Sequence, residues 1–300
     1  MKHILQSSIA LAAGALFFSA TGAQAGFAYS LADNGTSLIK FDLATPGAAT
    51  LVGPITGVGG RLDGIDFRPA DGLLYAYSAA TNGIYTLNLT TAAATFASTP
   101  TTASTTGTLG IDFNPFADRM RLVNPDDQNL RINVATGATT VDGVLAYAAL
   151  DPNQAANPSL TEAAYTNSDT NPGTGTTLYY IDSNLDTLVT TSNPNGGTLN
   201  TRGSLGFSTS DLTGFDILSD GVGGNTAYAL LTASSGVASL FTVDLNTGAA
   251  TSIGVINPPG GTARPFSLAV VQPVPEPGTA LFGLALLGVG ITRRNSRRRP

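Results

Sequence analysis

Three aspartates recur in one short context, with a glycine two positions earlier and an apolar residue on each side. They are Asp66, Asp112 and Asp216, within the segments 64–67, 110–113 and 214–217. Several carboxylate oxygens brought together bind a hard cation such as calcium. A repeated carboxylate can equally accept hydrogen bonds from backbone amides of the next repeat, and the repetition favours this structural role. The three residues are candidates for a ligand or cation site, with the structural role as the alternative.

Three arginines distinguish one region of the chain from the other repeats. Arg119, Arg121 and Arg131 alternate on neighbouring predicted strands, so they could converge on one face. Guanidinium groups bind carboxylates in a bidentate manner, which would suit an acidic ligand such as an acidic sugar. The alternative is that the arginines pair with nearby aspartates and tie two repeats together. Those aspartates are Asp118, Asp126 and Asp127.

Two loops rich in side-chain oxygens, 124–129 and 167–171, are weaker candidates for a calcium site. Their carboxylates are Asp126, Asp127 and Asp169. Neither loop has the Asp-x-Asp-x-Asp-Gly series with a closing glutamate that an EF-hand needs. Surface turns have the same composition for conformational reasons alone. Both interpretations stay open for these loops.

The elements that must position these residues are short strands in a repeated order. Five segments share the pattern strand, polar turn, strand, Thr-Gly-like turn and strand. They begin near Phe27, Leu74, Met120, Ala163 and Ala227. Apolar and polar side chains alternate along residues 84–89, the period of a strand. The Gly-x-Asp segments, at spacings of 46 and 104 residues, precede three of these units as a further strand, and 144–150 is expected to lead the fourth.

Four short antiparallel strands repeated every forty to fifty residues indicate an all-β chain folded as a β-propeller. The direct count is five blades. The strand expected at 265–271 would complete the first blade and close the ring without leaving a sheet edge at the seam. Six blades, or an open β-sandwich or solenoid, are the alternatives.

Several segments of these repeats resemble the bacterial domain of unknown function 4394. The resemblance rests on residues 110–115, 118–123, 128–131, 145–148, 164–167, 197–201 and 214–217, and it runs through most of 27–271. It implies a propeller-like β-fold and a secreted protein. It implies no activity, because the family has none assigned.

The first 25 residues have the order of a secretory signal peptide. Lys2 precedes an apolar run at 9–18, and the small residues Ala23 and Ala25 then give the small-x-small form of a cleavage site. Signal peptidase and the secretion machinery are therefore expected partners. The mature chain would begin near Gly26, and a first buried helix is the alternative.

The other end carries three features in a fixed order. Pro275, Glu276 and Pro277 are followed by an apolar stretch at 278–292 and then by arginines, of which Arg293 and Arg294 come first. Fifteen apolar residues are few for a stable membrane span, which needs about 20, although arginines would hold the segment with its end in the cytoplasm. The pattern predicts a transmembrane helix that anchors the protein in the inner membrane transiently. A plain C-terminal anchor is the alternative.

This tripartite tail resembles the PEP-CTERM sorting signal and would cover residues 273–300. The resemblance implies a Gram-negative bacterium, recognition by an exosortase, and release to the cell surface or the extracellular matrix. It also implies bacteria that make exopolysaccharide and live in biofilms. The propeller-like domain would then span residues 26–272.

Without its two ends, the chain is strongly acidic and lacks several catalytic groups. Residues 26–272 contain 8 basic and 19 acidic side chains, a net charge of −11. Such a domain repels phosphates, so no nucleic acid partner is expected. His3 is the single histidine and there is no cysteine. The mature domain can therefore use neither imidazole nor thiol chemistry, and it can form no disulfide.

These observations predict an exported, non-catalytic surface or matrix protein that binds exopolysaccharide or other surface proteins. We assign it no catalytic residue and no cofactor, except that calcium is compatible with the carboxylates. The alternative is a carboxylate- and calcium-dependent propeller hydrolase of the lactonase or glycosidase kind. Its only nominees would be the three repeated aspartates, because Glu162 is the sole glutamate of the domain.

Overall fold

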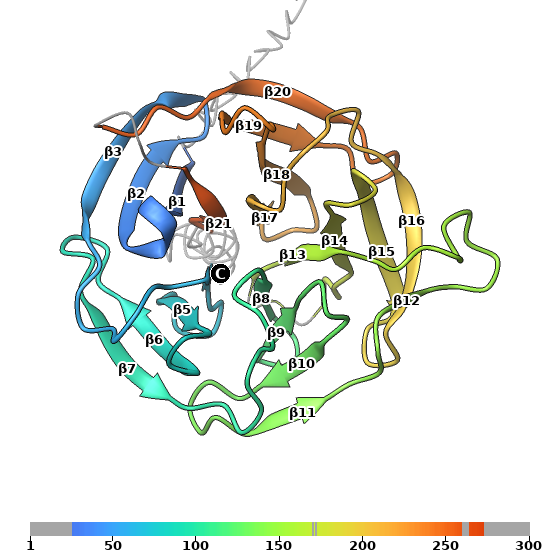
Figure 1. The fold of residues 1–300 in the computed structure, drawn as a ribbon, viewed down its shortest axis with the longest axis horizontal. Coiled ribbons are helices and arrows are strands. Elements are labelled where there is room, and N and C mark those ends of the chain that lie inside the picture. Colours follow the sequence, from blue (N-terminus) through green and yellow to red (C-terminus); the bar gives the residue numbers. More distant parts are fainter. Residues whose placement is uncertain (1–25, 170, 172, 260–263, 273–300) are drawn as a thin grey trace, which may run out of the picture.

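The computed structural model describes residues 26–272 except 170, 172 and 260–263. These residues form five sheets arranged as blades around a central axis, a five-bladed β-propeller (Figure 1). This confirms the predicted fold class and the predicted number of blades. Within these described residues, the one helical element is the short 3-10 turn η1 (Asp33–Gly35).

The strands of each blade are named here from the channel outward. Blade 1 contains β21 (Phe266–Val270), β1 (Phe27–Ala32), β2 (Ser37–Asp42) and β3 (Thr45–Pro54). Blade 2 contains β4 (Gly64–Phe67), β5 (Leu74–Ser78), β6 (Gly83–Leu87) and β7 (Ala94–Ser98). Blade 3 contains β8 (Gly110–Asn114), β9 (Arg119–Val123), β10 (Asn129–Ile132) and β11 (Thr139–Val141).

The remaining two blades complete the ring. Blade 4 contains β13 (Leu160–Tyr165), β14 (Leu178–Asp182), β15 (Thr187–Asn193), β16 (Thr198–Ser204) and, at its outer edge, β12 (Ala146–Tyr147). Blade 5 contains β17 (Thr213–Ser219), β18 (Asn225–Thr232), β19 (Ala238–Val243) and β20 (Ala250–Val255). The strand pairs within these sheets are antiparallel, except that β12 pairs with β16 in parallel.

The hydrophobic core lies between the blades. Each of five clusters of buried side chains joins two neighbouring sheets; for example, Ile39 and Phe41 of blade 1 pack with Leu240 of blade 5. The innermost strands are buried along nearly their whole length, whereas outer strands such as β3 and β11 are largely exposed. A propeller sheet is buried on both faces because a neighbouring blade covers each of them.

The ring closes where the sequence predicted it would. The strand β21 pairs with β1, so the two ends of the domain meet in blade 1. Beyond that ladder, the amide of Val271 donates a hydrogen bond to the carbonyl oxygen of Phe27. This closure leaves no unpaired inner edge at the seam.

The prediction for the fourth blade was wrong by one strand. Residues 144–150 do not lead this blade along the channel, because their only strand, β12, lies at its outer edge beside β16. The inner strand is β13, which the sequence had suggested as the second. Its Ala164-Tyr165 pair resembles the ends of second strands elsewhere, and it lacks the Gly-x-Asp signature of β4, β8 and β17.

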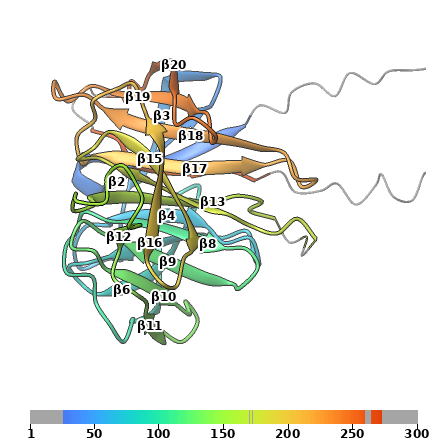
Figure 2. The same ribbon diagram turned by 90° about the vertical axis from the view of Figure 1, so that its right-hand side faces the viewer.

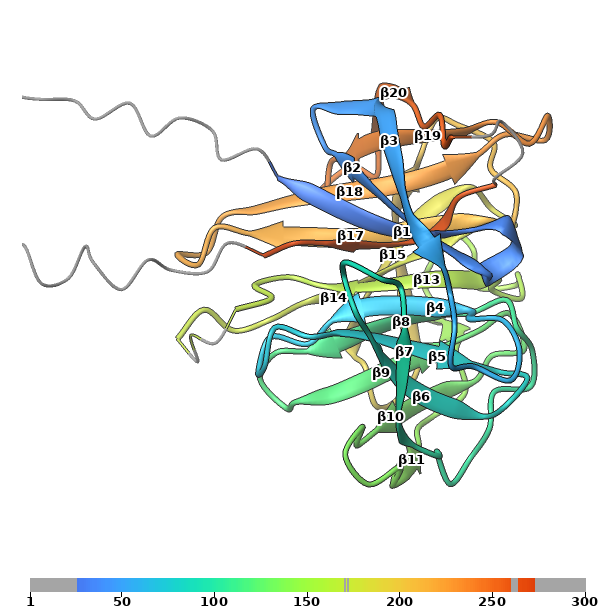
Figure 3. The same cartoon turned by 90° about the vertical axis from the view of Figure 1, so that its left-hand side faces the viewer.

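The propeller has two faces with different features. We call the tail face the one where the inner strands end; it carries Gln272 and the turns after β13 and β17 (Figures 2 and 3). The opposite one, where the inner strands begin and η1 lies, we call the groove face. Residue 272, the last before the predicted sorting tail, therefore lies on the face away from η1.

Candidate functional site

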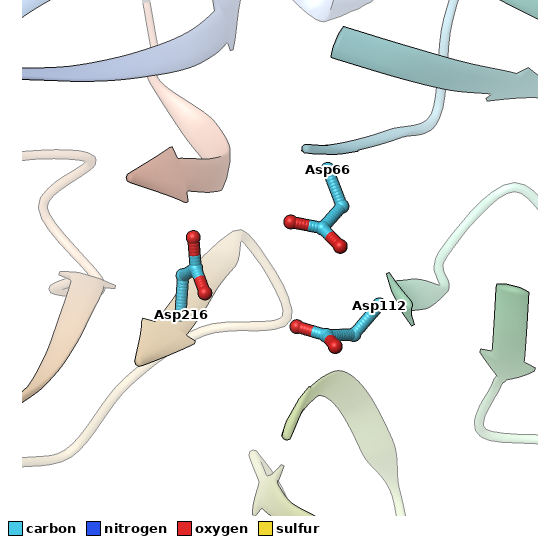
Figure 4. A group of neighbouring side chains, drawn as sticks. All are labelled: Asp66, Asp112 and Asp216. Carbon is cyan, nitrogen blue, oxygen red and sulfur yellow. The ribbon is translucent and has the colours of Figure 1, made fainter. Parts of the chain in front are cut away.

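The three repeated aspartates meet in the central channel. One carboxylate oxygen of each of Asp66, Asp112 and Asp216 lies within 4.8 Å of the others, and the side chains point toward one another (Figure 4). They come from the inner strands of blades 2, 3 and 5, and all three are almost completely buried. In the part of the chain that the structure describes, this is the one group of three or more possible metal ligands so close together.

The aspartates also make the contacts of the structural alternative. Asp66 accepts a hydrogen bond of 2.9 Å from the amide of Phe113 in the next blade, and Asp216 accepts one of 2.6 Å from the amide of Val270. Asp66 and Asp216 therefore each join two inner strands, as the structural role expected from the sequence requires.

Asp112 differs from the other two in one respect. Its Oδ1 atom is buried and has no hydrogen-bond partner among the described residues. A buried acceptor without a donor costs about 1–3 kcal/mol, and more when it is charged. The unpartnered oxygen belongs to one of the three carboxyl groups that point toward one another.

A fourth carboxyl group, which the sequence analysis did not assign to this site, comes from blade 4. Glu162 on β13 is 2% exposed. Burial and the charges of Asp66 and Asp216 raise the pKa of Asp112, and the charge of Glu162 adds to this effect. The amide of Phe113 faces Asp66, and the amide of Tyr165 faces Asp112 in the same way. When β8 and β13 are aligned on these two amides, Glu162 takes the position of Gly110. Ala164 stands at the aspartate position, so the carboxyl group of blade 4 comes from two residues earlier on its inner strand.

Burial raises the pKa values of all four carboxyl groups. Loss of hydration is the largest cause for each, and the neighbouring negative charges add to it for Asp66, Asp112 and Glu162. The pKa of Asp216 rises to about 7, limited by hydrogen bonds from the amides of Val270 and Ile217. Three carboxyl groups within 4.8 Å of one another, with Glu162 near enough to act on them through its charge, favour a bound positive charge, either protons or a metal ion.

A polar groove crosses the groove face over the mouth of the channel. Its middle is a pocket of about 140 Å³ that Glu162 and Asp63 line. On one side it shares Arg61, Asp63 and Gly107 with a pocket of about 300 Å³ along 104–107. On the other side it shares Asp211 with a pocket of about 480 Å³ lined chiefly by serine, threonine, asparagine and aspartate. The lining of this last pocket includes Ser159, Ser183, Asn184, Ser208 and Thr209.

Arg61 is the cation of this groove. It donates hydrogen bonds of 2.7 Å to Asp63 and 2.6 Å to Asn34. Asp63 also accepts a hydrogen bond from the amide of Ala79, and burial raises its pKa. The arginine is thus held at the channel mouth by partners in blades 1 and 2.

Two of the three candidate arginines converge, and they do so on an aspartate. Arg121 and Arg131 both donate to Asp142, at 2.6 Å each to its Oδ2 atom. Arg121 is 1% exposed. Its other contacts are Tyr165, Asn129 and Asn195, which join blades 3 and 4. Arg119 donates instead to the carbonyl oxygens of Ala117 and Asp118.

The weaker calcium candidates lie apart from the channel, two of them in one loop and the third on the opposite face. Asp126 accepts from the Thr105 hydroxyl on the groove face, and Asp127 has a positive φ of 59° in the same loop. Asp169 lies on the tail face, where it accepts from the amide of Asn171 and the hydroxyl of Ser219. The structure therefore does not combine these three carboxylates in one site.

The signal and sorting residues lie outside the described residues. These are Ala23 and Ala25 near the first end, and Pro275, Glu276, Pro277, Arg293 and Arg294 near the second. The predicted transmembrane helix at 278–292 lies there as well. Among the residues that the structure does describe, no helix combines the length and the apolar character needed to cross a membrane.

Comparisons with known proteins bear on both parts of the chain. The family described as a domain of unknown function (DUF4394) matches residues 37–265, and the PEP-CTERM protein-sorting motif matches residues 273–298. Both resemblances expected from the sequence are thereby confirmed. No curated protein matches the chain.

Solved structures similar to this chain are distant. One is a protein of unknown function from Bacteroides thetaiotaomicron, with 16% identity, a TM-score of 0.49, and 82% of this chain and 65% of that chain covered. The chain thus spans just under two thirds of that protein. A chain in a nidogen/laminin complex has 11% identity and a TM-score of 0.44, and the match covers 79% of this chain and 81% of that chain. Catalytically inactive virginiamycin B lyase from Staphylococcus aureus, solved with quinupristin, has 12% identity and a TM-score of 0.42. That match covers 81% of this chain and 73% of the lyase chain.

Proposed function

The chain belongs to the family of the domain of unknown function (DUF4394), and we propose that it is an exported, non-catalytic surface protein that binds a polysaccharide chain along its groove face. The PEP-CTERM motif at 273–298 implies export and processing by an exosortase. Retention at the cell surface or in the extracellular matrix is part of the proposal. A domain bounded at residues 26 and 272 would be its mature form.

The observation that carries the proposal is the continuity of the groove. Three pockets of about 300, 140 and 480 Å³ share residues, so they form one elongated depression that crosses the channel mouth. A compact metabolite would need only one of them, whereas a chain of sugar units would occupy them in series. Hydroxyl, carboxamide and carboxylate groups line the groove, and these exchange hydrogen bonds with sugar hydroxyls.

Charge points to a neutral polysaccharide. The domain has a net charge of −11, and Asp63 and Asn34 already engage the guanidinium of Arg61 in the groove. An acidic polymer would be repelled by the domain as a whole. The acidic sugar considered for the arginine cluster is disfavoured further, because Asp142 occupies Arg121 and Arg131.

The position of the groove also fits surface display. It lies on the face opposite Gln272, the residue that leads into the sorting motif. A chain attached to the surface through its end at Gln272 would present the groove away from the point of attachment. This orientation supports a binding role at the surface.

The hydrolase alternative has less support from the geometry. Of the channel carboxyl groups, Glu162 is the one that lines the groove. The nearby Asp63 accepts hydrogen bonds from Arg61 and from the amide of Ala79. Asp211, which lines the same pocket, accepts a hydrogen bond from the hydroxyl of Ser183. Glycoside hydrolysis would need a second carboxyl group free to act as acid or base beside Glu162.

The test is retention of the purified protein on immobilised polysaccharides. The panel contains neutral dextran, acidic alginate and the exopolysaccharide prepared from the protein's own host. We expect retention on neutral polymers and on the host polymer, and none on alginate. If no polymer retains the protein, the proposed function is wrong.

Two matched variants test whether the groove is the binding surface. Asn184 in the groove and Asn246 on the tail face are both exposed turn residues whose amides donate to the aspartate two positions earlier. Asn184→Trp should weaken retention at least tenfold, whereas Asn246→Trp should leave it unchanged. Equal retention of the two variants would place the binding surface elsewhere.

A further inference from the structure

We infer that the central channel binds one calcium ion between Asp66, Asp112 and Asp216, and that this ion ties blades 2, 3 and 5 together. This inference is independent of the polysaccharide proposal. It concerns the interior of the ring, whereas the polysaccharide would lie in the groove above it.

The distances fit a single ion. One oxygen from each aspartate lies within 4.8 Å of the other two. Calcium binds oxygen at about 2.3–2.6 Å, so oxygens up to about 5 Å apart can contact the same ion. The ligands need only small adjustments, because all three side chains already point toward one another (Figure 4).

The unpartnered oxygen is the second observation. Oδ1 of Asp112 accepts no hydrogen bond from the described residues. Water cannot easily replace that partner, because Asp112 is only 1% exposed. No arginine or lysine in the described part of the chain forms an ion pair with any of the three aspartates. A cation coordinated by this oxygen would supply the missing partner and the missing positive charge.

The surroundings hold the carboxylates in place. Asp66 and Asp216 each use one oxygen to accept a backbone amide from the neighbouring inner strand, at Phe113 and Val270. Those bonds fix the rotation of the carboxyl groups before an ion arrives, which lowers the cost of ordering the ligands. Glu162 approaches from blade 4 and adds a fourth negative group beside the site.

The donor set and the burial favour calcium over other ions. Carboxylate oxygens select magnesium, calcium or manganese rather than softer metals. Magnesium usually keeps several of its waters in a strict octahedron, whereas calcium takes six to eight oxygen ligands, from protein groups and from water, in flexible geometry. A buried set of carboxylates between backbone strands therefore suits calcium best.

The experiment measures calcium alone on the purified protein. Metal analysis of the protein as isolated, and equilibrium dialysis after treatment with a chelator, give the number of ions bound per chain. We expect one. Thermal unfolding of the same samples should show a rise in Tm of about 5 °C at a free calcium concentration one hundred times Kd, for a domain of roughly 250 residues. A protein that binds no calcium in either measurement overturns the inference.

Two aspartate-to-asparagine variants complete the test. Asp112→Asn keeps the shape of the side chain but removes the anionic oxygen, and we expect calcium affinity to fall at least tenfold. Asp244→Asn alters an exposed turn aspartate remote from the channel and should bind as the wild type does. Undiminished binding by Asp112→Asn would overturn the site. If that variant does not fold, the stoichiometry of the wild-type protein still decides the question.

Discussion

Substituting alanine for each of three repeated glycines should produce a graded loss of stability. Gly64, Gly110 and Gly214 each stand two positions before a channel aspartate. None of them has a positive φ, so alanine can adopt the backbone conformation at each site. The effect of a methyl group then depends only on what it meets in the neighbouring blade.

The contacts predict the order of the effects. A Cβ atom on Gly110 would lie 2.3 Å from Cα of Glu162, and one on Gly214 would lie 2.8 Å from Cβ of Leu268. On Gly64 it would meet the end of the Leu109 side chain at 3.0 Å. Since ordinary contact begins at 3.4 Å, β8 and β13 would have to separate by about 1 Å in Gly110→Ala. A flexible side-chain end can rotate away, but a backbone atom held in a sheet cannot.

We expect Gly110→Ala to lose about 3 kcal/mol of unfolding free energy and Gly64→Ala less than about 1 kcal/mol. With an unfolding entropy of about 0.5 kcal/mol/K for roughly 250 residues, these losses lower Tm by about 6 °C and less than about 2 °C. Gly214→Ala should fall between them. The assay is thermal unfolding followed by circular dichroism on the purified proteins. If Gly110→Ala and Gly64→Ala unfold within 2 °C of each other, the close approach of the inner strands does not explain these glycines.

Two further predictions concern ion pairs. Asp118 has a pKa below its ordinary 3.8 because Arg68 donates to it; this stabilises the fold above that pH and is lost as the pH falls. In urea unfolding at pH 7, Arg68→Ala should therefore be less stable than the wild type by about 1 kcal/mol or less. This difference in stability should vanish near pH 3, and a difference that grows in acid would contradict the prediction. Arg121→Ala leaves the buried Asp142 with one partner fewer and should lower the free energy of unfolding by about 3–5 kcal/mol. Arg131→Ala should lower it far less, because Arg131 is partly exposed. Equal losses in urea unfolding would refute the assigned roles.

The fold could be predicted from the sequence because its signals are local. Turn residues and alternating side chains each indicate a single hairpin, and a Gly-x-Asp segment indicates a single inner strand. Counting the repeats of these patterns predicts five blades. The seam was predictable because the first unit lacked an inner strand and the chain supplied one at its end. Blade 4 was misaligned because β13 carries Glu162 and Ala164 where the signature has glycine and aspartate.

The candidate site was predictable only in part. The recurrence of Asp66, Asp112 and Asp216 at the same place in a repeat indicated that they face one axis. The contribution of Glu162 was not visible, because it depends on the length of one side chain and on the register between blades 3 and 4. The groove arises from loops of all five blades whose composition is that of ordinary turns, so only their arrangement in space reveals it.

The most direct test of the proposed function is amide hydrogen exchange with and without the neutral polysaccharide that the protein retains best. The account predicts slower exchange in the groove-face segments 104–109, 157–160, 183–186 and 208–212, and unchanged exchange in the tail-face turn 220–224. Protection confined to the tail face, or none at a saturating polysaccharide concentration, would contradict it.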